Sequence, residues 1–202
     1  YQTSVENLGE FGDIGSLNTA IAQKEGYLKI RILKDTSLTA FPYAEGISGI
    51  KITPEYGEEY TLTLSEETYE VKTDVVLETG LEIRQEGSHI KGNDSEIILM
   101  STTVNGGTLS TEDLGLVLAG TVTVNAKIDG ADALYINQNI STTNNNGSVE
   151  WENQYPYANV FINAAVTEIK EFFIYGDKVF ISGSGRLSTE KISGVYGDSD
   201  LQ

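Results

Sequence analysis

The sequence has no cysteine and few of several other residue types, and each shortage excludes a class of protein. Without Cys there are no disulfides and no thiolate chemistry. His89 is the single histidine, so the His and Cys sets that usually bind zinc are absent. Neither a Gly-x-Ser-x-Gly nucleophile turn nor a phosphate-binding glycine loop occurs. Only three prolines stand against 21 glycines, a balance that favours tight turns between paired strands.

Positive charge is also scarce. Lys and Arg total 13 against 30 Asp and Glu, which gives a net charge of −17. Such a surface repels nucleic acid phosphates and anionic membranes, and no apolar run reaches the roughly 18 residues of a membrane helix. We therefore expect no sequence-specific nucleic acid binding and no membrane partner. The charge suits a subunit that repels its copies before assembly, or a lumen along which DNA slides without sticking.

The remaining reactive residue types do not predict an enzyme. His89 lies in a polar, turn-like stretch, where a solvated loop residue is expected rather than a catalytic base. Adjacent carboxylates such as Glu66 and Glu67 point to opposite faces of a strand, so they do not form the facing pair of a glycosidase. The ten acids between Glu55 and Glu86 are interpreted as a solvated acidic sheet face.

Short segments that alternate apolar and polar residues predict strands along most of the chain. Tyr27–Leu33 turns Leu28, Ile30 and Ile32 to one face, and Ile47–Thr53 repeats the pattern. Gly, Asn and Asp bound most of these segments, as turns require. No internal repeat is evident. We predict an all-β fold, an antiparallel sandwich or barrel, with a single domain over 27–196 and a flexible tail over 197–202.

One segment predicts a helix instead. Ser110 and Asp113 resemble a capping box, and Leu114, Val117 and Leu118 form an apolar stripe at helical spacing. Gly120 can end the helix, so a short helix is expected near 111–119.

The first 26 residues are polar and interrupted by glycines, and their apolar residues recur every three positions. They are predicted to form an extended N-terminal arm (1–26) that docks on another surface; a short helix covering the domain's own core is the alternative. The predicted contact residues of this arm are Val5, Leu8, Phe11, Ile14 and Leu17.

Aromatic residues gather in two places. Trp151, Tyr155 and Tyr157 suggest an interface anchor or a sugar platform, with core packing as the alternative. Phe172 to Tyr175 are interpreted as core and cross-strand pairs.

No cofactor is expected, although Ca²⁺ is possible because it accepts carboxylate and carbonyl oxygens. The candidate calcium ligands are Asp129, Asp132, Asp198 and Asp200. Three glycosylation sequons, relevant only in an exported protein, begin at Asn93, Asn139 and Asn146.

The middle of the chain, residues 46–121, resembles the tail tube proteins of long-tailed bacteriophages. Gly46–Tyr56 is similar to the strand that opens their sandwich, and Leu109–Thr121 to the short helix that follows. The resemblance implies a hexameric ring stacked into a tube, with the acidic face lining a lumen through which DNA passes.

Together these observations predict a self-assembling structural subunit of a tube or filament, whose partners are copies of itself. A phage tail tube would place it in the virion. The alternative is an exported filament subunit at the cell surface, joined by donation of the arm as a strand; the start at Tyr1 rather than Met and the sequons favour it. A carbohydrate-binding module that uses Trp151 is a second alternative.

Overall fold

A computed structural model describes residues 8–137, 141–143, 149–152, 157–175, 178–196 and 200–201, and only the backbone of 141–143, 149–152, 194–196 and 200–201. The elements are α1 (Ile14–Ile21), β1 (Gly26–Ile32), β2 (Thr36–Leu38), β3 (Ile47–Pro54), β4 (Thr61–Leu64), β5 (Thr68–Glu70), β6 (Asp74–Leu77), β7 (Gly80–Ile83), β8 (Ser88–Met100), β9 (Thr103–Gly106), β10 (Thr108–Val124), β11 (Lys127–Ile136), β12 (Ser141–Thr143), β13 (Val149–Glu152), β14 (Ala158–Ile162), β15 (Ala165–Tyr175), β16 (Val179–Ser182), β17 (Arg186–Tyr196) and β18 (Asp200–Leu201). Among these residues no helix is long and apolar enough to cross a membrane.

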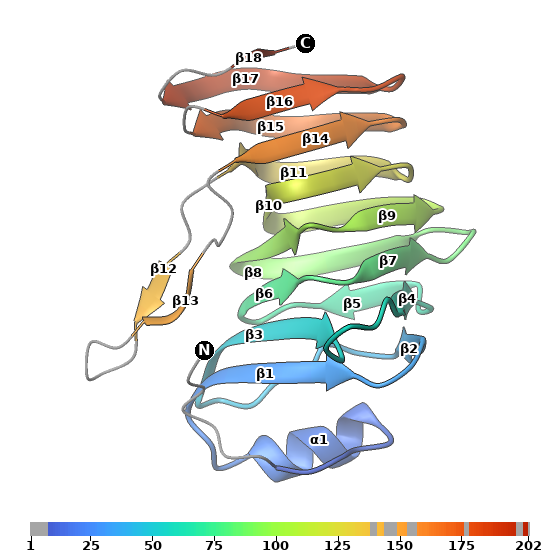
Figure 1. Cartoon of the computed structure of the whole chain (residues 1–202), viewed down its shortest axis with the longest axis vertical. Helices are drawn as coiled ribbons and strands as arrows, with labels where there is room; N and C mark the ends of the chain where they lie inside the picture. The colour runs from blue at the N-terminus through green and yellow to red at the C-terminus, as the bar shows by residue number, and fades with distance from the viewer. Residues whose placement is uncertain are drawn as a thin grey trace.

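The chain winds into a stack of coils, a parallel β-solenoid (Figure 1). Each strand pairs with the equivalent strand of the next coil. Sheet A contains β1, β3, β6, β8, the first part of β10, β11, β15 and β17, with β5 beside β8. Sheet B contains β2, β4, β7, β9, the end of β10, β14, β16 and β18.

Every strand pair in these two sheets is parallel, so the predicted antiparallel sandwich or barrel is wrong. The strand-rich character was correctly predicted, but alternation reports which face of a strand is buried, not which way its neighbour runs. Strands that follow one another along the chain, such as β15 and β16, lie on different sheets of the solenoid.

The core is built from columns of apolar side chains, one from each coil of sheet A. One column contains Leu28, Ile50, Val75, Ile97, Leu116, Leu134, Phe172 and Ile192. Successive members are 18 to 25 residues apart, except for 38 between Leu134 and Phe172. Because the coils differ in length, the stack has no fixed sequence period, which is why no repeat was visible.

The segment predicted as a helix, 111–119, lies inside β10. Leu114 and Leu116 point into the core, whereas Val117 packs on the outer side of the sheet, and all three are buried. A strand that is buried on both faces has a continuous run of apolar residues. Such a run includes apolar residues three and four positions apart, which is also the spacing of an amphipathic helix. The helix prediction was wrong for this reason.

Sheet A bends at a corner in the middle of its longer strands. Asp94, Asp113 and Glu168 have positive φ values of 55°, 52° and 56°, and Gly130 has 89°. The pairing registers shift beside these residues, so β8, β10, β11 and β15 turn at equivalent places. Positive φ is uncommon for residues with a side chain, and Asp tolerates it better than most.

The N-terminal end of the stack is closed by α1, below β1 in Figure 1. Leu17 and Ile21 are buried in the main core, and Leu8 and Ile14 pack partly against it. Residues 14–21 are therefore a helix that covers the domain's own core, and the prediction of an extended arm is wrong for them. The carboxylate of Asp13 accepts the Ser16 backbone N–H at 2.7 Å, which caps the helix. Phe11 is partly exposed, and Val5 lies outside the described residues.

The C-terminal end differs. β17 pairs with β15 on one side and has no strand partner on its other side among the described residues. Ile192, the last member of the core column, is 61% exposed, while the seven earlier members are at most 4% exposed. The last two described residues, within the predicted tail, form β18 on β16.

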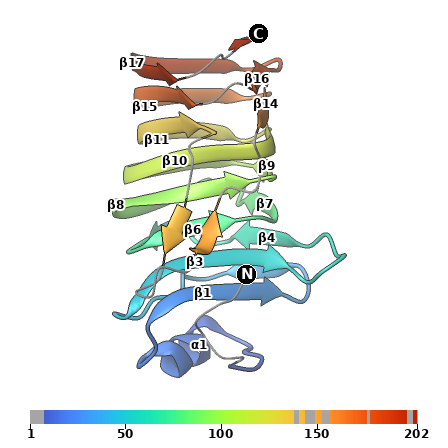
Figure 2. The same ribbon diagram turned by 60° about the vertical axis from the view of Figure 1, so that its left-hand side comes forward.

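One coil carries an insertion. Between β11 and β14 the chain leaves the stack, and β12 and β13 form a separate antiparallel pair (Figure 2). The core columns continue across the insertion, because Leu134 still pairs with Phe172.

Candidate functional site

The outer face of sheet A carries an unusual mixture of apolar, charged and aromatic side chains. Val76, Ile98, Met100 and Val117 are at most 2% exposed although they lie on the side away from the core. Tyr27 and Tyr135 pack against this second apolar cluster.

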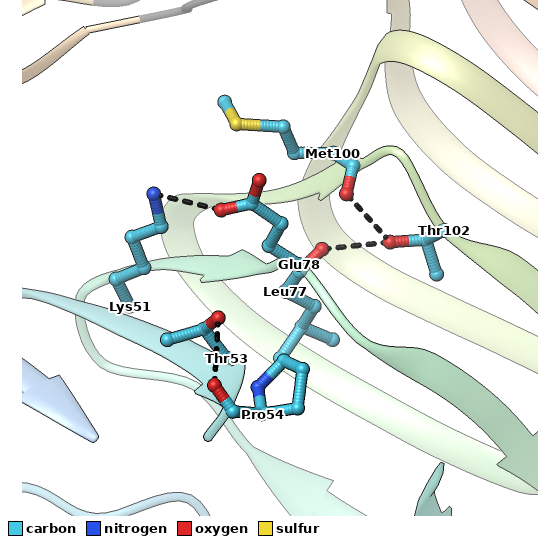
Figure 3. A network of polar contacts seen from close by, with 7 residues as sticks. All are labelled: Lys51, Thr53, Pro54, Leu77, Glu78, Met100 and Thr102. Carbon is cyan, nitrogen blue, oxygen red and sulfur yellow. Dashed lines mark hydrogen bonds and ion pairs between the residues drawn. The ribbon is translucent and has the colours of Figure 1, made fainter. Parts of the chain in front are cut away.

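A buried ion pair lies next to this cluster. Lys51 is 4% exposed, and its Nζ lies 2.9 Å from Oε2 of Glu78 on the next coil (Figure 3). Burial, together with the positive charge of Lys51, lowers the pKa of the adjacent Lys29. Thr102 contacts the carbonyl oxygens of Leu77 and Met100 at 2.8 and 3.0 Å, which anchors the turn from sheet A to sheet B.

Two carboxylates lie side by side on neighbouring strands of the outer face. Asp74 of β6 and Glu96 of β8 occupy adjacent positions on the outer face, and Asp74 Oδ1 accepts the Glu96 backbone N–H at 2.9 Å. Glu96 is half-buried, and burial followed by the nearby charge of Asp74 raises the pKa of its carboxyl. Gly115 follows Glu96 in register, so no side chain covers that carboxyl from the next coil.

Three aromatic rings extend this outer face toward the C-terminal end. Tyr135 and Phe173 stack with centroids 4.9 Å apart and planes 18° apart, and Phe173 and Tyr175 stack at 6.3 Å. Tyr135 of β11 pairs with Phe173 of β15 in register, whereas Tyr175 lies two positions further along β15. We call these three residues the aromatic cluster.

One member of the aromatic cluster faces a position without a side chain. Gly194 pairs with Phe173 on the next coil, whereas Tyr175 pairs there with Tyr196. Glu171 and Lys191 flank this position, and their charged groups lie 3.9 Å apart. An apolar ring face beside a carboxylate and an ammonium group can hold a ligand that has both an apolar face and hydroxyl groups.

Electrostatics connect the carboxylate pair to the aromatic cluster. The pKa of the Tyr135 phenol is raised, first by burial and then by the charges of Glu96, Tyr175 and Glu171. A tyrosine hydroxyl can both donate and accept a hydrogen bond. The arrangement offers hydrogen-bond donors and acceptors next to stacked rings.

The single histidine is not in a loop as expected but in β8. Its Nε2 lies 3.2 Å from Oε2 of Glu112 on the neighbouring strand, and the side chain is 41% exposed. Lys91 lies 3.8 Å from the same carboxylate group, so His89 belongs to a surface charge cluster away from the aromatic cluster.

Two of the four predicted calcium ligands, Asp129 and Asp132, have side chains among the described residues. Asp129 is exposed at the corner of sheet A, and Asp132 binds Lys170 Nζ at 2.7 Å. Asp198 and the side chain of Asp200 lie outside the described residues. In the part of the chain that is described, no group of three or more potential metal ligands occurs.

The predicted interface and glycosylation residues are only partly described. Trp151 lies in β13 with its side chain outside the described set, and Tyr155 is also outside it, as are Asn139 and Asn146. Tyr157 is half-buried, and Asn93 is exposed in β8. Phe172 lies in the core as predicted.

Sequence reasoning missed the members of the candidate site on earlier coils, Asp74, Glu96 and Tyr135. Asp74 approaches Glu96, Glu96 approaches Tyr135, and Tyr135 meets Phe173 only through the coil register, and no local motif marks them. Comparison with family models, curated proteins and solved structures found no match for this chain.

Proposed function

We propose that this protein binds a neutral carbohydrate chain on the outer face of sheet A. The observation that carries the proposal is the aromatic cluster, in which Phe173 faces Gly194 of the next coil beside the Glu171–Lys191 pair. The C–H face of a pyranose ring packs on an aromatic ring, while its hydroxyls hydrogen-bond to charged side chains. Parallel coils repeat at about 4.8 Å, so they can present successive contacts along an extended ligand.

Charge decides which carbohydrates fit. Glu171 and Glu96 act on Tyr135 of the aromatic cluster, and Asp74 lies beside Glu96, in a chain of net charge −17. Uronate or sulfate groups would meet repulsion there, whereas neutral hydroxyls gain acceptors. Neutral glycans are therefore the expected class.

Affinity electrophoresis and calorimetry against starch, cellulose oligomers, mannan, xylan and the anionic polygalacturonate test the proposal. We expect at least one neutral member to bind and polygalacturonate not to bind. Phe173→Ala should weaken binding at least tenfold. Phe180→Ala is the matched control, because Phe180 is 43% exposed on the outer face of sheet B. Equal losses in both variants, or binding of polygalacturonate alone, would contradict the proposal.

A self-assembling structural subunit stays the second candidate function. The tail tube version depended on a helix over Leu109–Thr121, a segment that is strand in this fold. The observation that favours assembly is now the open C-terminal end of the solenoid.

A further inference from the structure

The open end of the solenoid exposes core that every other coil hides. Leu187 is only partly buried, and Ile192 is 61% exposed, although both continue apolar columns of the interior. Burying apolar surface contributes about 25 cal/mol per Å². Solenoids that expose such an end need a cap or a partner to stay soluble.

The two ends are not equivalent. α1 covers the N-terminal end with Leu17 and Ile21, so a second copy cannot continue the stack there without displacing the helix. At the other end of the stack, β17 has a strand partner on one side among the described residues, so its second edge can accept another molecule by strand pairing (Figure 1). When each copy has one open end, the arrangement that covers both is open end to open end, which has two-fold symmetry and closes.

The sequence of β17 is complementary to itself in that arrangement. Thr189 pairs with the buried Ile169, and Leu187 with the buried Val166, so both face inward, while Arg186, Ser188 and Glu190 face outward. When two such strands run antiparallel about an axis at Ser188, Arg186 of each copy faces Glu190 of the other. Opposite charges placed directly across an antiparallel pair are favourable, and two such ion pairs form.

We propose that two copies of this chain form a two-fold dimer through antiparallel pairing of β17 over Arg186–Glu190. This register sets Leu187 of one copy opposite Thr189 of the other and brings the two open cores together. The register shift between Ile192 and Gly194 lies beyond this segment.

Sedimentation velocity across a wide concentration range at physiological ionic strength measures the association. A monomer of 21.9 kDa should convert reversibly to a species of twice that mass. Ile192→Asp should raise the dissociation constant at least tenfold. Phe180→Asp is the control, since it also adds a charge near the same end but on the outer face of sheet B. A monomer at all concentrations, open-ended polymers, or equal effects of both variants would overturn the proposal.

A charge exchange and a cysteine test the register itself. Arg186→Glu and Glu190→Arg should each weaken the dimer, and the double variant should restore it, because both ion pairs are then reversed. Ser188→Cys should give a disulfide-linked dimer under mild oxidation, and no native cysteine competes with it. Thr121→Cys, exposed on sheet B, is the control and should not cross-link. Failure of the double variant to recover, or equal cross-linking at both sites, would refute the register.

Discussion

The residues on the neighbouring coils change the pKa of the Glu96 carboxyl. Its own position in β8 is an ordinary outward-facing strand position, between the buried Ser95 and Ile97. Asp74 on the previous coil adds negative charge, and Gly115 on the next coil adds no side chain. The carboxyl is therefore half-buried against apolar neighbours with a like charge beside it, and both effects raise its pKa.

Glu96→Gln should make stability less dependent on pH. A carboxyl whose pKa is raised in the folded state stabilises the fold below the unfolded pKa of Glu, and this contribution is lost as pH rises through the folded value. The variant should thus unfold at a higher temperature than wild type at pH 7 and show no such advantage near pH 3. Glu82→Gln is the control on sheet B. A benefit at pH 3 equal to that at pH 7 would argue against this origin.

At the scale of elements, side chains at coil turns join the coils along the axis. Asn125 Nδ2 donates to Asn105 Oδ1 at 2.8 Å, and Asn163 Nδ2 donates to Asn125 Oδ1 at 2.9 Å. The Ser184 backbone N–H reaches Asn163 Oδ1 at 3.4 Å. Asn105 lies in β9, and Asn125 and Asn163 directly follow β10 and β14. The three side chains form a hydrogen-bonded ladder along the ends of the sheet B strands.

Asn125→Ala should destabilise the protein by about 1 kcal/mol, because it removes both ladder hydrogen bonds of the central residue at an exposed site. Asn125→Asp keeps the acceptor for Asn163 but loses the donor to Asn105, so it should also destabilise. Urea unfolding of both variants gives the comparison. Asn159→Ala, on the outer face of β14, should leave the unfolding midpoint unchanged, and an equal shift there would count against a ladder contribution.

The elements also show where sequence reasoning succeeds. Tyr27–Leu33 and Ile47–Thr53 were predicted as strands and lie over β1 and β3, because alternation is a local property. Their direction and partners were not predictable, since residues that pair in adjacent coils are separated by unequal stretches of chain. Phe173 meets Tyr135 in this way across 38 residues, so the aromatic cluster left no signal within either segment.

The whole molecule is close to one-dimensional, because each coil contacts its two neighbours and little else. Stability in such a stack is local, and a defect at one end need not reach the other. The helix α1 has a particular place in this scheme, since it is the neighbour of the first coil on one side.

Ile21→Ala should cost about 3 kcal/mol, and the loss should be confined to the N-terminal coils. Hydrogen exchange should accelerate in β1 and β3 while β15 keeps its protection. Leu116→Ala, equally buried in the middle of the stack, is the matched comparison and should affect β8 and β11 on both sides. Uniform acceleration through all coils in the Ile21 variant would show instead that the solenoid unfolds as one unit.

The insertion between β11 and β14 has a consequence for how such a protein can diversify. The apolar columns of the core keep their register across the insertion, because Leu134 still pairs with Phe172. A long insertion at this turn therefore leaves the packing between the coils unchanged. Turns of this kind are sites where evolution can exchange whole segments while retaining the scaffold. The same turn is thus a natural position for grafting a foreign sequence onto the rigid stack.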